Sequence, residues 1–165
     1  MLSNAYFLLV FGDNVEEHLG PVFYLPLLLG AHLAGLALHA AGNPGDATPL
    51  VGASAGIAGV IACYAVLYPK ARLGFLFWWY GFFTRWLLMP AWGALILYIL
   101  VQIFGAAMQI RGFSRVSYLG HLGGLAFGVG AGVVARAIRE RRTPSFVRKK
   151  PADSYRDSRE HVYQK

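Results

Sequence analysis

Apolar stretches about as long as a lipid bilayer is thick constrain the fold of this chain more than any other feature. Four of them, residues 22–41, 50–68, 87–110 and 116–137, are almost free of charged side chains. A hydrocarbon core of about 30 Å needs roughly 20 apolar residues in a helix, so each stretch can cross once. A further apolar stretch, residues 1–12, is too short to cross unaided. We therefore predict an all-α, polytopic transmembrane helix bundle, and number these spans from the first, residues 1–12, to the fifth.

The composition also indicates a membrane protein. Of the 165 residues, 56% are hydrophobic and 14% are charged, whereas a soluble domain carries about 25% charged residues. All eight acidic residues lie outside the apolar stretches. Most of the net charge of +7 follows Gly132, where a topology signal explains it better than a nucleic-acid site does. No nucleic-acid partner is expected.

The distribution of lysine and arginine predicts the orientation. With a cytoplasmic C-terminus, thirteen of the fifteen basic residues lie inside, and only Arg111 and Arg115 lie outside. We therefore expect a multi-pass protein of a prokaryotic plasma membrane, with a transmembrane domain at residues 1–138. Residues 139–165 are expected to form a basic, poorly ordered cytoplasmic tail. We expect this tail to anchor the bundle at the bilayer, with specific binding of anionic lipids as the alternative.

Two connections between the spans carry structural predictions. Residues 13–20 are polar and indicate a turn. Residues 69–86 are rich in tryptophan, phenylalanine and tyrosine and are flanked by basic side chains. Such a composition is typical of a segment that lies along the membrane interface, where aromatic rings prefer to sit.

Three polar side chains from distant stretches are predicted to share one depth in the membrane. The first, third and fifth spans run in parallel from outside to inside. Ser54 is the fifth residue of the third span, His121 is the sixth residue of the fifth, and Asn4 lies near the start of the first. At 1.5 Å per residue, Ser54 and His121 lie about 6 to 9 Å below the outer ends of their helices.

Small residues predict that the third and fifth spans approach closely. The fifth span carries glycines at four-residue intervals, and the third carries a similar pair. These predicted packing glycines are Gly52, Gly56, Gly120, Gly124 and Gly128, with Gly132 continuing the series. Glycines at this spacing let two helix backbones approach because no side chain intervenes. General helix packing explains them equally well, but the paired helices are those that carry Ser54 and His121.

The combination of residue types is typical of acyl transfer. A serine hydroxyl becomes a good nucleophile when a neighbouring base removes its proton, and histidine is the usual base. No carboxylate lies in any span, so the chemistry available is a Ser54–His121 dyad. The backbone N–H of Ser54, near a helix N-terminus, and the side-chain amide of Asn4 are candidate donors to the oxyanion. The alternative for His121 is a structural hydrogen bond to a backbone carbonyl.

Other polar residues give weaker signals. His32 and His39 are seven residues apart on one face of the second span and could suggest a metal site with His121. No acidic or cysteine ligand accompanies them at a suitable spacing, so we expect no metal and no cofactor. Cys63 is the single cysteine of the chain and is expected to be a small packing residue.

Four segments in one order resemble the rhomboid family of intramembrane serine proteases. They are the segment N-A-Y-F-L-L-V-F-G-D-N-V-E-E-H-L-G from Asn4, G-A-S-A-G-I-A-G around Ser54, L-Y-P-K-A-R followed by aromatic residues and L-M-P-A-W, and G-H-L-G-G-L-A-F-G around His121. The resemblance implies a helical membrane domain with a water-accessible cavity open to the outer side. It also implies that Ser54 attacks the peptide bond, His121 acts as base, Asn4 helps to hold the oxyanion and Gly124 packs closely.

The chain departs from the family pattern in four ways. The family has a preceding span and usually a histidine four residues before the asparagine, a position that would fall before Met1. The glycine that usually follows the serine is Ala55 here. The aromatic residue that often stacks under the histidine from four positions after the serine is replaced by Ala58.

Three functions follow, of which we favour an intramembrane serine endopeptidase that cleaves transmembrane protein substrates. The alternative is a catalytically impaired, rhomboid-like protein that binds membrane clients without cleaving them. A small transporter subunit that uses the intramembrane histidines is the third.

Overall fold

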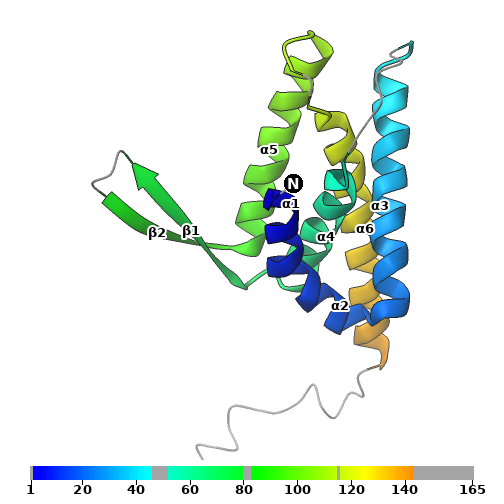
Figure 1. Ribbon diagram of the computed structural model, residues 1–165. Coiled ribbons are helices and arrows are strands. Elements are labelled where there is room, and N and C mark those ends of the chain that lie inside the picture. The colour runs from blue at the N-terminus through cyan, green and yellow to red at the C-terminus, as the bar shows by residue number, and fades with distance from the viewer. Residues whose placement is uncertain (1, 46–51, 80–82, 115, 143–165) are drawn as a thin grey trace, which may run out of the picture.

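The computed structural model describes residues 2–45, 52–79, 83–114 and 116–142. In that part of the chain, helices form a bundle and one two-stranded hairpin projects from its side (Figure 1). The elements in chain order are α1 (Leu2–Phe7), the π-helical η1 (Leu8–Gly12), α2 (Asp13–Leu19), α3 (Pro21–Gly42), α4 (Ser54–Leu67), β1 (Arg72–Trp79), β2 (Phe83–Pro90), α5 (Ala91–Ile110) and α6 (Tyr118–Arg142).

The predicted polytopic helical bundle is confirmed. Among the described residues, α3, α5 and α6 are each long and apolar enough to cross a membrane. α6 continues through Arg142, four residues into the predicted tail, whose remaining residues, 143–165, lie outside the described part of the chain.

The third predicted span is shorter than expected. Residues 50–68 were predicted as one helix, but α4 has 14 residues and is therefore only about 21 Å long. It begins at Ser54 because Gly52 has φ of +136°, a backbone conformation that no α-helix contains. Ser54 is thus the first residue of its helix and not the fifth.

The prediction of a turn at residues 13–20 is wrong. The backbone is helical from Leu2 to Leu19, because η1 joins α1 to α2 with helical dihedral angles at both of its boundaries. A helix pairs its own backbone N–H and C=O groups. These groups therefore need no outside partner where the chain passes out of the apolar layer. The helix ends at Gly20, where φ is +79° and the backbone N–H donates to the carbonyl of Glu16.

Two strands, β1 and β2, cover most of the aromatic stretch at residues 69–86, and its location along the membrane interface stays a prediction. β1 and β2 are antiparallel, with Arg72 opposite Pro90 and Trp79 opposite Phe83. Aromatic and branched residues favour extended strands, and pairing the two strands satisfies their backbone groups. Because the hairpin includes residues 87–90, α5 begins at Ala91, four residues later than the predicted fourth span.

α4 is the central helix of the bundle. Its residues 55–60 are all buried, and it packs against both α3 and α6. Gly124 and Gly128 of α6 lie directly against the backbone of α4. A methyl group added at Gly124 would lie 2.8 Å from the carbonyl carbon of Ala55, and one added at Gly128 would lie 2.6 Å from the Cα of Gly59. The predicted close approach of these two helices therefore depends on the absence of a side chain at Gly124 and Gly128.

Substitution of Gly128 by alanine tests this packing. The added methyl group overlaps the Gly59 backbone, so we expect the protein to lose about 1–3 kcal/mol of stability, as in other overpacked cores. The matched control is Gly130→Ala on the same helix, where an added methyl group has no atom within 4 Å. Thermal unfolding in detergent should show a lower Tm for Gly128→Ala only, and equal Tm values would contradict the packing argument.

Candidate active site

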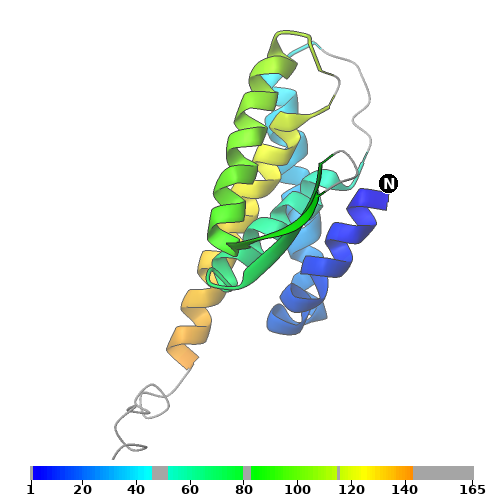
Figure 2. The same ribbon diagram turned by 90° about the vertical axis from the view of Figure 1, so that its left-hand side faces the viewer.

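Ser54 lies at a recessed helix N-terminus. α4 begins well below the ends of α3 and α5 in both views (Figures 1 and 2), so the first residue of α4 lies inside the bundle. As the first helical residue, Ser54 has a backbone N–H with no intrahelical partner. The site therefore offers the hydroxyl and the backbone N–H of the same residue at the start of α4.

The structure brings the imidazole of His121 to this hydroxyl. His121 is the fourth residue of α6, and its Nε2 lies 2.9 Å from the Oγ of Ser54. The two residues are 67 positions apart in the sequence. The packing of α6 glycines on α4 just below this point holds the two side chains at hydrogen-bonding distance.

Gln102 of α5 is a site residue that the sequence analysis missed. Its side chain is only 4% exposed, and its Oε1 lies 2.9 Å from the Nδ1 of His121. An amide oxygen can only accept a hydrogen bond, so Nδ1 donates to Gln102 and, in the neutral imidazole, Nε2 is left to accept from the Ser54 hydroxyl. The signal was present, because a glutamine within an apolar span is costly unless it is paired or functional.

An aromatic ring also contacts His121, although it does not come from α4. The ring of Tyr118 meets the imidazole edge-on, with centroids 6.2 Å apart and an interplanar angle of 78°. Tyr118 packs in turn against Gly105 of α5. Ala58 is fully buried in a cluster with Ala62 and Leu125. The imidazole thus contacts Gln102 of α5 and Tyr118 of its own helix, whereas the family pattern often has an aromatic residue at the position of Ala58.

A second polar network fixes the start of α6. The Oγ of Ser117 lies 2.8 Å from the Nδ1 of His39 on α3 and accepts the backbone N–H of Gly120 at 3.1 Å. Gln109 of α5 joins it, with its Nε2 3.3 Å from His39 and its Oε1 accepting the N–H of Leu119. Three helices are therefore tied together one turn from His121.

The predicted oxyanion and packing residues have different outcomes. Asn4 is half-buried on α1, and the start of α1 lies close to the start of α4 (Figures 1 and 2), but no hydrogen bond from Asn4 is found among the described residues. Gly52 was predicted to pack helices and does not, because it lies exposed before α4. Gly56 and Gly120 are buried, with Gly56 facing the carbonyl of Leu28 on α3.

The histidines outside this pair do not assemble into a metal site. Within the described ranges, no three histidine, cysteine, aspartate or glutamate side chains lie close enough to hold an ion. His39 belongs to the Ser117 network. The Nδ1 of His32 is buried without a hydrogen-bond partner among the described residues.

Comparison with known families decides the assignment of the chain. The family model of the rhomboid domain matches residues 1–138. The chain belongs to the rhomboid family. No curated protein and no solved structure matches it. Rhomboid-family proteins are serine intramembrane proteases that act on transmembrane substrates.

The Ser117 network of this rhomboid domain can be tested through stability. Ser117→Ala removes the side-chain acceptor for Gly120 and the contact with His39, so we expect a loss of about 1 kcal/mol, as for other helix caps. Ser3→Ala on the exposed surface of α1 is the matched control. Thermal unfolding in detergent should lower the Tm of Ser117→Ala alone, and an unchanged Tm would show that the network does not hold α6.

Proposed function

We propose that this chain is an intramembrane serine endopeptidase that uses Ser54 as nucleophile and His121 as general base. The observation that carries the proposal is the 2.9 Å separation between the Ser54 hydroxyl and the His121 Nε2. Such a distance lies within the reach required for proton transfer. Family membership and the recessed position of the pair in a membrane bundle support the same function.

The proposed reaction uses each of these groups at a defined atom. The Oγ of Ser54 attacks the carbonyl carbon of the scissile peptide bond while its proton moves to the Nε2 of His121. The backbone N–H of Ser54 and the Asn4 amide donate to the oxyanion that forms. His121 then returns the proton to the leaving amine, the C–N bond breaks, and the acyl group stays on Ser54. Water, deprotonated by His121, hydrolyses this ester.

Gln102 acts in this scheme as a positioning residue. Ser-His-Asp enzymes use a carboxylate to hold the imidazole tautomer and to stabilise the imidazolium. The neutral amide of Gln102 can do the first of these and does the second only weakly. The site therefore selects the productive tautomer without placing a buried negative charge in an apolar span.

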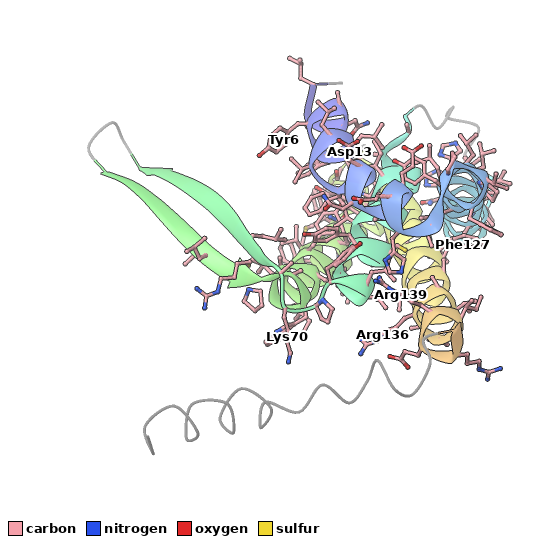
Figure 3. All side chains as sticks on the ribbon, turned by 90° about the horizontal axis from the view of Figure 1, so that it is seen from below. Tyr6, Asp13, Lys70, Phe127, Arg136 and Arg139 are labelled. Carbon is pink, nitrogen blue, oxygen red and sulfur yellow. The ribbon has the colours of Figure 1, made fainter. Side chains whose placement is uncertain are left out.

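The substrate and the side of cleavage follow from the membrane setting. We propose that the substrates are transmembrane proteins. The substrate helix unwinds around its scissile bond near the start of α4. Lys70 and the arginines in the last turns of α6 lie at the opposite end (Figure 3, seen from below, labels Lys70, Arg136 and Arg139). By the positive-inside rule this end is cytoplasmic, so cleavage takes place toward the outer face.

A fluorophosphonate probe tests the nucleophile directly. We expect the detergent-solubilised protein to be labelled, Ser54→Ala to abolish labelling, and His121→Ala to reduce it at least 100-fold, as for loss of a general base. The same variants should fail to cleave a transmembrane peptide in proteoliposomes. Gly130→Ala, where the added methyl group has no atom within 4 Å, should behave as the unsubstituted protein. Labelling that survives Ser54→Ala would contradict the role of Ser54 as nucleophile. A folded protein that does not cleave would favour the alternative of a rhomboid-like protein that binds clients without cleaving them.

The role of Gln102 predicts a separate kinetic signature. Gln102→Leu keeps the shape of the side chain and removes the acceptor, which leaves the Nδ1–H of His121 buried and unpaired. That loss is worth about 1–3 kcal/mol, so kcat should fall about 5- to 150-fold with little change in KM. Gln102→Glu retains an acceptor and should recover part of the activity. A normal kcat in a folded Gln102→Leu protein would remove Gln102 from the mechanism.

A further inference from the structure

A groove that the proteolytic site does not use opens at the opposite end of the bundle. It has a volume of about 880 Å³, and α2, the first turns of α3 and the C-terminal half of α6 form its walls. Pockets of this size commonly hold small molecules. Its lining separates into a polar mouth and an apolar interior, so a single occupant must satisfy both.

The mouth of the groove carries a connected polar cluster. The Nη1 of Arg139 donates to the Nδ1 of His18 at 2.9 Å, and the Oη of Tyr68 lies 3.2 Å from the same nitrogen. The Tyr68 hydroxyl donates to the carbonyl of Asn14 at 3.3 Å. Burial and the nearby Arg139 guanidinium hold the pKa of His18 below its usual value, which favours the neutral imidazole. Glu17 also lines the mouth. Arg139 thus supplies the positive charge, and its planar guanidinium suits a phosphate group.

The interior of the groove is apolar. Its lining includes Phe23 and Leu27 of α3 and Val134 and Ile138 of α6. The ring of Phe127 lies against the backbone of α3 at Gly30, where an added methyl group would overlap it (Figure 3 labels Phe127). No polar side chain lines this part of the groove, so its occupant must present hydrocarbon.

The length of the groove distinguishes a lipid from a transmembrane helix. Phe127 and Arg139 are 12 residues apart on α6, which corresponds to a rise of about 18 Å. Half of the hydrocarbon core is about 15 Å, whereas a spanning helix needs about 30 Å of contact. The groove therefore extends from the helix end to roughly the middle of the bilayer, which is the depth of one leaflet.

We propose that this groove is a binding site for one phospholipid, with an acyl chain between α3 and α6 and the phosphate on Arg139. A phosphodiester accepts hydrogen bonds from a guanidinium, and charge-assisted bonds of this kind are the strong ones. The bound lipid bridges α2, α3 and α6 at the end of the bundle away from Ser54. It therefore stabilises the domain without contacting the proteolytic site.

Photocrosslinking tests the site with a defined probe. The full chain is reconstituted in phosphatidylcholine vesicles that contain a small fraction of phosphatidylglycerol with a photoreactive acyl chain, and the crosslinked peptides are mapped by mass spectrometry. We expect crosslinks at the start of α3 and within residues 127–138. Excess unmodified phosphatidylglycerol should compete. Glycerol 3-phosphate should not compete, and if it did, the site would bind phosphate alone and the lipid proposal would fail.

Matched variants separate binding in the groove from general attraction to the surface. Arg139→Gln should lower crosslinking about tenfold, because a charge-assisted hydrogen bond is lost. Arg136→Gln removes the same charge three residues away, from a side chain that pairs with Glu140 at 3.1 Å and does not line the groove. It should leave crosslinking unchanged (Figure 3 labels both arginines). Equal losses in the two variants would overturn the proposal.

A third variant tests the apolar part of the site. Ala135→Trp fills the groove while it leaves Arg139 in place, and should reduce crosslinking as strongly as Arg139→Gln does. An unchanged Tm in lipid-free detergent shows that the variant is folded. Undiminished crosslinking in folded Ala135→Trp would show that the acyl chain lies elsewhere and would overturn the proposal.

Discussion

The contact between the backbones of α4 and α6 is the constraint on which the rest of the structure depends. Gly124 and Gly128 lie so close to Ala55 and Gly59 that neither glycine can carry a methyl group without displacement. In a membrane, where helices gain little from burying apolar side chains, such close van der Waals packing drives association. One consequence is that the first turn of α6 is held beside the first residue of α4, which places an imidazole next to a hydroxyl.

Polar groups around that contact are organised by hydrogen bonds between different helices. α5 contributes Gln102 to His121 and Gln109 to the network of His39 and Ser117. Each bond satisfies a group that would otherwise be unpaired in an apolar environment, where an unmade hydrogen bond is costly. The two networks restrain the imidazole in different ways, since one sets its tautomer and the other sets the position of the helix that carries it.

The two ends of the bundle are suited to different chemistry. At one end α4 begins late, so the Ser54–His121 pair lies below the tops of the neighbouring helices. At the other end the last turns of α6 carry basic side chains beside an apolar groove of one leaflet's depth. About 21 Å of α4 lies between them, and its length fixes their separation.

The order of four short segments was sufficient for the family, and sequence periodicity and composition were sufficient for the helical membrane class, because hydropathy over 20 residues is a local property. They could not give the start of α4, which the φ of +136° at Gly52 sets. Nor could they give the helix at residues 13–19 or the strands at 72–79 and 83–90. The polar and aromatic residues of these segments are compatible with several backbone conformations.

What the sequence by itself determined is which side chains are available at each depth: a serine, a histidine and glycines on neighbouring spans. Tertiary structure alone decided which of them meet. Gln102 was one of two glutamines in its span, and only the packing of α5 beside α6 brings it to the Nδ1 of His121. Hydrogen bonds between helices depend on the rotation and tilt of each helix, and these are fixed by packing across the whole bundle and not by any one segment.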